Sequence, residues 1–80
     1  MHTLFDLKIG SQAKIKEINC SEVVKRRMMD LGIVKGTPIK AILKSPSGNP
    51  KAYEVRGSVI AIRSEEARRI KIIKEQQRYD

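Results

Sequence analysis

The side chains in this chain that could carry out chemistry are few and far apart. The single histidine, His2, and the single cysteine, Cys20, have no partner ligand at the spacing that metal sites require. The neighbouring carboxylates Glu65 and Glu66 do not complete a site. The only histidine, His2, is next to the terminus, so a Ser-His or Cys-His pair is not expected. The sequence therefore predicts no catalytic residue, no metal site, no cofactor and no enzymatic activity.

The basic residues are the stronger signal. The chain has 17 Lys and Arg against 9 Asp and Glu, which gives a net charge of +8 and favours acidic partners. Lys25, Arg26 and Arg27 form a run of three cations. One alternative is that the charge only keeps the surface soluble. A nucleic-acid interface would need aromatics among the cations for base stacking, and Tyr53 is the one aromatic with a suitable position.

Length and composition predict one compact domain over residues 1–80, with its core at about 4–74 and a polar tail at 75–80. The hydrophobic share is 40% and the charged share 32%, as in folded globular domains. A lone cysteine excludes an internal disulfide and suits a reducing compartment. The longest apolar run, Val59–Ile62, is too short to span a bilayer, and no secretory signal is visible. We therefore expect a cytoplasmic protein.

The first half of the chain alternates between helical and strand patterns. A helical turn is predicted over Leu4–Leu7, closed by Gly10, and a strand over Gln12–Ile18. The alternation of this strand breaks at Ile18, which indicates a bend or bulge there.

A helix is predicted between Ser21 and Leu31. Ser21 is a good N-cap, and Val24, Met28 and Leu31 are spaced to share one buried face. Gly32 suits the left-handed position that ends a helix.

The second half reads as strands separated by turns. A turn at Gly36 precedes a strand whose inward residues are Ile39, Ala41 and Leu43, and Gly57 makes a tight connection between two later strands. The remaining elements are a loop over Pro46–Pro50, strands around Tyr53 and Val55 and over Ser58–Arg63, a helical turn at Ser64–Glu66 and a last strand over Ile70–Ile73. Five short strands with close turns indicate a small closed or nearly closed barrel.

Taken together, these segments resemble the FeoA family. The resemblance rests on RRMMDLG at Arg26–Gly32, Gly36-Thr37 and the Pro46–Pro50 loop, with further matches at Leu4, Leu7, Gly10, Gly57, Ala61–Arg63 and Glu66-Ala67. It covers about Leu4 to Lys74. The sequence departs from the family pattern at two places. Ser45 and Ser47 flank Pro46 where family members often carry Ala and Leu, and Lys35 stands where they often carry Pro.

The resemblance implies a mainly β fold, namely a small SH3-like β-barrel of about five strands with an inserted α-helix and short helical turns. It also implies an accessory or regulatory role in bacterial ferrous iron transport, through binding to the membrane transporter FeoB at its cytoplasmic side. No activity as an enzyme and no nucleic-acid partner are expected, and transition metal ion binding is a term attached to the family as a whole. The alternatives are an isolated SH3-like regulatory module related to metal-dependent repressors, or a basic nucleic-acid-binding barrel.

Two segments are the candidates for contact with the partner. The first is the helix surface, with its cations and an outward methionine; the second is the loop held in shape by two prolines and a glycine. The predicted partner-binding residues are Lys25, Arg26, Arg27, Met29, Pro46, Ser47, Gly48, Asn49 and Pro50. The predicted structural residues are Gly10, Gly32, Gly36 and Gly57.

Overall fold

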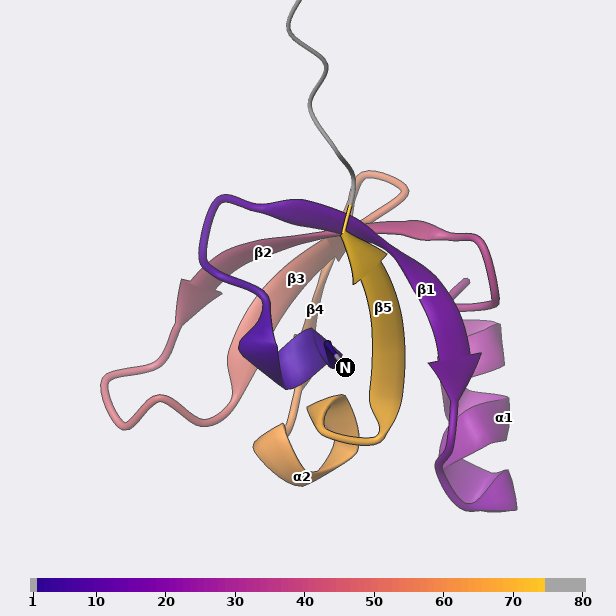
Figure 1. The fold of residues 1–80 in the computed structure, drawn as a ribbon. Helices are drawn as coiled ribbons and strands as arrows, with labels where there is room; N and C mark the ends of the chain where they lie inside the picture. Colours follow the sequence, from indigo (N-terminus) through magenta and orange to yellow (C-terminus); the bar gives the residue numbers. More distant parts are fainter. Residues whose placement is uncertain (1, 75–80) are drawn as a thin grey trace, which may run out of the picture.

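The computed structural model describes residues 2–74, which form a five-stranded antiparallel sheet in the order β4-β3-β2-β1-β5. In chain order the elements are η1 (Leu4–Asp6), β1 (Gln12–Ile18), α1 (Glu22–Asp30), β2 (Pro38–Lys44), β3 (Lys51–Val55), β4 (Ser58–Ile62), α2 (Ser64–Ala67) and β5 (Ile70–Lys74). Figure 1 shows the sheet strongly curved, with α1 outside the end of β1 and α2 below the barrel opening. The predicted mainly β fold with one inserted helix is confirmed.

The barrel is not closed by a strand pair, because β4 and β5 are the two edges of the sheet in the described part of the chain. The segment before β1 lies along the outer edge of β5 instead. Thr3 forms a β-bridge with Lys71, and the backbone N–H of Ile72 donates to the carbonyl oxygen of His2 at 3.0 Å. Helix η1 then packs against β5 and α2. The N-terminal segment therefore covers an edge that would otherwise be open to pairing.

Helix α1 buries less of its surface than the sequence pattern predicts. Its N-cap is Ser21, as expected, and Met28 is fully buried. Val24 is only half-buried, however, and Leu31 is 42% exposed. The prediction that Leu31 lies on the buried face is wrong, because the helix ends at Asp30 and the chain turns away at Gly32.

The C-terminus of α1 ends in a Schellman motif, with two backbone hydrogen bonds around Gly32. The N–H of Ile33 donates to the carbonyl of Met28 at 2.8 Å, and the N–H of Gly32 donates to that of Met29 at 2.9 Å. This pattern needs a left-handed residue just past the helix, and Gly32 has φ of +86°. Ile33 and Met28 are both fully buried, so the turn is also fixed by the core.

Two register shifts decide which strand residues face inward. In β1 the pairing with β5 shifts between Ile15 and Glu17, so the bulge lies before Ile18 and not at it as predicted. In β2 the pairing with β3 shifts between Ala41 and Leu43. Leu43 is consequently 56% exposed, and its predicted inward position is wrong.

The β3–β4 connection is a two-residue turn made by Arg56 and Gly57, with φ of +52° and +84°. Positive φ at both positions is typical of the type I′ turn, whose twist matches a hairpin. Strand β4 is the most apolar strand in sequence, yet it is an edge strand. Val59 is 63% exposed, and only Ile62 is fully buried.

The core lies inside the curved sheet. Its largest buried side chains are Tyr53, Leu4, Leu7, Ile15, Met28, Ile33, Ile39, Ile62, Ile70 and Val55. No helix within residues 2–74 is long and apolar enough to cross a membrane. The predicted polar tail at 75–80 lies outside the described residues.

Candidate functional site

Three of the four predicted helix-surface residues point outward from α1. Lys25 and Arg26 are exposed, and Met29 is 60% exposed. Arg27 differs, because its guanidinium pairs with the carboxylate of Glu66 in α2 at 2.5 Å. The run of three cations therefore offers two unpaired charges, and Arg27 serves to hold α1 against α2.

Lys25 and Met29 line a groove between α1 and the end of β1, with a volume of about 360 Å³. We call it the α1–β1 groove; the other residues that line it are Lys16, Glu17, Ile18, Ile33, Val34 and Lys35. In Figure 1 this region is at the right, where α1 runs beside the arrowhead of β1. A helix, a strand end and the Gly32–Gly36 turn thus contribute one wall each.

The turn that carries Val34 is held by Thr37, the one buried polar residue in the described core. The hydroxyl of Thr37 donates to the carbonyl of Gly32 and accepts from the N–H of Val34, both at 3.2 Å. Two backbone hydrogen bonds attach the turn to Ile15 of β1. The N–H of Ile15 donates to the carbonyl of Thr37 at 3.0 Å, and the carbonyl of Ile15 accepts from the N–H of Gly36 at 2.7 Å. The groove wall is therefore fixed by hydrogen bonds at its base.

The α1–β1 groove combines an apolar lining with a basic rim. Ile18, Met29 and Val34 supply exposed or half-buried apolar surface. The charged residues of the rim are Lys16, Lys25 and Lys35 together with one carboxylate, Glu17, and all four are exposed. Such a surface suits a partner that brings carboxylates together with an apolar side chain.

The predicted loop contact, Pro46–Pro50, is ordered by its own hydrogen bonds. The N–H of Gly48 donates to Ser45 at 2.8 Å, and the hydroxyl of Ser47 donates to the carbonyl of Asn49 at 3.0 Å. Pro46, Ser47, Asn49 and Pro50 are exposed, and Gly48 is half-buried. The two serines that depart from the family pattern are thus used inside the loop, since their hydroxyls also lie 3.3 Å apart.

The structure does not bring the two predicted contact segments together. In Figure 1 the loop between β2 and β3 lies at the left and α1 at the right, with α2 between them. Helix α2 is tied to both: the N–H of Ser64 donates to Oδ1 of Asn49 at 3.0 Å, and Glu66 pairs with Arg27. The helix surface and the loop are therefore two separate candidate surfaces joined by α2.

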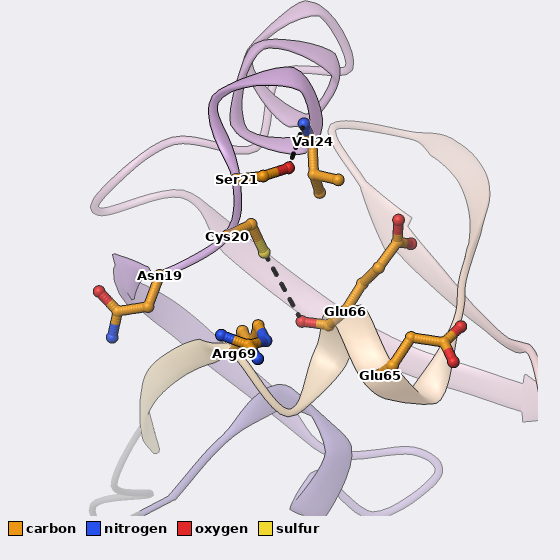
Figure 2. Close-up of a pocket in the computed structure, with 7 residues that line it drawn as sticks. All are labelled: Asn19, Cys20, Ser21, Val24, Glu65, Glu66 and Arg69. Carbon is orange, nitrogen blue, oxygen red and sulfur yellow. Dashed lines mark hydrogen bonds between the residues drawn. The ribbon is translucent and has the colours of Figure 1, made fainter.

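A second pocket, of about 640 Å³, lies between the start of α1 and α2. Figure 2 shows Cys20, Ser21 and Val24 on one side and Glu65, Glu66 and Arg69 on the other. The thiol of Cys20 points across to the backbone carbonyl of Glu66 at 3.9 Å. Burial, and then the charge of Glu66, raise the pKa of the Cys20 thiol above its usual value.

The acidic groups of this second pocket do not converge. In Figure 2 the carboxylate of Glu66 extends toward α1, whereas that of Glu65 extends away from it. Among residues 2–74 no group of three or more His, Cys, Asp or Glu is placed to hold a metal ion. The thiol is protonated at neutral pH and the Glu66 carboxylate is engaged by Arg27, so this pocket offers no activated nucleophile.

The aromatic residue expected to be available for base stacking is not on the surface. Tyr53 is fully buried, and its hydroxyl donates to the carbonyl of Leu4 at 3.3 Å. Phe5 is half-buried between two cations: Cζ of Arg68 lies 4.3 Å and Nζ of Lys51 5.2 Å from its ring centre. In the described part of the chain, neither ring offers a free face next to the basic residues.

Of the residues that line the groove, the sequence analysis predicted only Lys25 and Met29 as contacts; Lys16, Ile18, Val34 and Lys35 were not among the predicted contacts. Lys16 lies at the bulge of β1, Ile18 lies where the alternation breaks, and Val34 and Lys35 share one turn, so only the fold places them together. The departure at Lys35 from the family pattern was a usable signal, because it adds a third cation to the rim.

The chain is similar to known proteins in both sequence and structure. The model of the FeoA domain matches residues 2–74. A Campylobacter jejuni protein with a provisional assignment as Fe(2+) transport protein A is 31% identical over 70 residues, which cover 88% of this chain and 95% of that protein. The solution structure of FeoA from Chlorobium tepidum matches with a TM-score of 0.88 at 32% identity, over 91% of this chain and 70% of that one.

Further structural likeness supports the SH3-like fold. The crystal structure of a zinc complex of Stenotrophomonas maltophilia FeoA, described as a prokaryotic SH3 domain protein, matches with a TM-score of 0.79 at 28% identity, over 90% of this chain and 89% of that one. A manganese-dependent transcriptional repressor matches with a TM-score of 0.83 at 12% identity, over 92% of this chain and 41% of that one, a likeness that shows the fold alone. Since the family model spans nearly the whole chain, this protein belongs to the FeoA family.

Proposed function

We propose that this protein is a cytoplasmic accessory protein of bacterial ferrous iron transport, and that it acts as a binding module that docks on the membrane transporter FeoB. Membership of the FeoA family carries the transport role. The net charge of +8 favours an acidic protein surface as the docking partner. It acts without catalysis of its own, in keeping with the isolated Cys20 and the scattered carboxylates.

The contact is proposed to involve the exposed cations of α1, Lys25 and Arg26, with the Pro46–Pro50 loop as a second contact. Arg27 contributes indirectly, because its ion pair with Glu66 keeps α1 in place. Docking through exposed charges weakens as salt is added, since such charges are screened beyond roughly 8–10 Å at physiological ionic strength.

The experiment measures binding of the full chain to the full-length transporter reconstituted in lipid nanodiscs, together with ferrous iron uptake in cells. The variant Lys25→Glu/Arg26→Glu reverses the charge on α1. Lys8→Glu/Lys40→Glu makes the same charge change on exposed residues that line no part of the α1–β1 groove. We expect the first variant to lose binding and uptake and the second to keep both.

Two results would contradict this proposal. If the wild-type chain does not bind the transporter but retains nucleic acid, the basic-barrel alternative replaces it, although buried Tyr53 argues against base stacking. If the α1 variant binds and transports like the wild type with an intact fold, the docking surface is not on α1. The repressor-module alternative is favoured by fold likeness only.

A further inference from the structure

We propose that the α1–β1 groove receives an extended acidic segment of the transporter, with one apolar side chain seated between Met29 and Val34. This inference rests on the proposed function and names the chemistry of the partner at one surface. It separates Lys25, which lines the groove, from Arg26, which does not.

The apolar part of the argument comes from exposure. Met29 is 60% and Val34 36% exposed, although both border the fully buried Ile33. The whole groove that they help to line, about 360 Å³, is at the lower end of the range of pockets that hold small ligands. An apolar side chain placed there would cover surface that the monomer leaves in contact with water.

The charge of the groove favours acidic residues on either side of the apolar side chain of the ligand. Among the described residues, no carboxylate pairs with Lys16, Lys25 or Lys35. The acidic residue at this end of β1, Glu17, has its carboxylate 3.8 Å from Nζ of Lys71 on the neighbouring strand β5. Glu17 also lines the groove, so three ammonium groups stand against one carboxylate that is shared with Lys71, and the lining keeps an excess of positive charge. A segment that carries glutamate or aspartate complements that excess.

The backbone of β1 favours an extended ligand. Strands β1 and β2 pair only over Gln12–Lys14, and Ile15 is hydrogen-bonded to the turn before β2. Beyond it, Glu17 and Ile18 pair with β5 alone in the described structure. The opposite edge of these last β1 residues is thus open toward α1. A peptide lying between an open strand edge and a helix can add as a short strand, with alternate side chains turned into the groove.

Charge also argues against two other occupants. A second copy of this chain would bring a further net charge of +8 to a rim that is already basic. A nucleic acid could pair its phosphates with the lysines. Its bases, however, would find no aromatic side chain to stack on, because none lines the groove. An acidic, apolar protein segment satisfies both parts at once.

The first test uses the full-length transporter in nanodiscs and two matched pairs of variants. Met29→Glu places an acid inside the groove, and Val23→Glu makes a similar change at a residue of the same helix that is 81% exposed and outside the groove. Lys25→Glu reverses a rim charge, and Lys8→Glu is its control. We expect Met29→Glu and Lys25→Glu to weaken binding by roughly fivefold to tenfold, and the controls to stay within about twofold.

The second test does not depend on the transporter. The wild-type chain is titrated with a short capped peptide of alternating glutamate and leucine and, separately, with its lysine–leucine counterpart, while amide NMR shifts are recorded. We expect saturable shifts at Glu17, Ile18, Val34 and Lys35 with the acidic peptide alone, and their loss in Met29→Glu.

The outcomes separate the two proposals. If the transporter binds but Val23→Glu weakens it as much as Met29→Glu, the groove proposal is overturned and docking on FeoB stands. If the wild type does not bind the transporter, docking on FeoB fails together with the transporter segment as occupant, and the peptide titration decides whether the groove binds acidic extended segments. Absent shifts, or equal shifts with the basic peptide, would then overturn the groove as well.

Discussion

The guanidinium of Arg27 lies 2.5 Å from the carboxylate of Glu66, and this ion pair joins α1 to α2 across 39 residues of sequence. The Glu66 side chain is 13% exposed and that of Arg27 53% exposed, so the pair is half open to solvent. It positions the helix that carries the proposed docking surface. It also engages the charge of one member of the basic run, Arg27, within the protein.

Because the pair is partly exposed, it should contribute little to stability. A double-mutant cycle of Arg27→Ala and Glu66→Ala, followed by urea unfolding, is expected to give a coupling energy of about 0.2–1 kcal/mol, and a smaller one in high salt. A coupling well above that range and insensitive to salt would mean that the pair is effectively buried.

Gly32 should be intolerant of a β-branched side chain for reasons of backbone conformation. Its φ is +86°, while a Cβ built on it would meet Cδ of Arg56 at 3.5 Å, an ordinary contact. We expect Gly32→Val to lose roughly 1–3 kcal/mol of unfolding free energy. Gly32→Asn, which tolerates the left-handed region, should lose less. Equal unfolding midpoints for the wild type and Gly32→Val would remove this account of the helix end.

The buried phenol of Tyr53 predicts a loss of stability in alkali. Burial raises the pKa of Tyr53 from 10.0 to about 12. The folded state therefore holds this proton more tightly than the unfolded state. Its contribution is fully present below about pH 10 and is lost as pH rises through about 12, because only the unfolded chain ionises in that window.

Tyr53→Phe is the control for that pH dependence. It removes the titrating group and the hydrogen bond to Leu4, which should cost about 0.5–1.5 kcal/mol at neutral pH. Chemical unfolding of both proteins at pH values between these limits measures the effect. If wild type and variant lose stability in parallel, Tyr53 is not the group responsible.

Cys20 should react slowly with alkylating reagents in the folded protein. Burial and the Glu66 charge raise the pKa of its thiol, and only the thiolate is nucleophilic. We expect iodoacetamide to modify Cys20 more slowly in the native protein than in urea at the same pH. A native rate equal to the unfolded rate would show that the second pocket leaves the thiol open.

We also predict that the chain holds no tight ferrous iron site of its own. Iron in proteins needs several converging oxygen, nitrogen or sulfur ligands. Within residues 2–74 no three such side chains are grouped. Anaerobic equilibrium dialysis should show weak binding at most, with His2→Ala as the control. Stoichiometric binding that survives this substitution would contradict the prediction.

The sequence by itself determined the local elements of this protein. The N-cap at Ser21, the helix stop at Gly32 and the tight turn at Gly57 depend on the conformational preferences of single residues and lie where expected. Alternation identified the strands, because side chains of a strand point to opposite faces in turn. The family resemblance then identified the fold as SH3-like.

Only the tertiary structure decided which side chains are available to a partner. The register shifts next to Glu17 and Leu43 arise from pairing between distant strands, so alternation along one strand did not reveal them. The buried Tyr53 is hydrogen-bonded to Leu4, which is 49 residues away, and Arg27 is paired with Glu66, which is 39 residues away. The α1–β1 groove is of the same kind: its walls come from a strand, a helix and a turn, and their meeting is a property of packing rather than of local sequence.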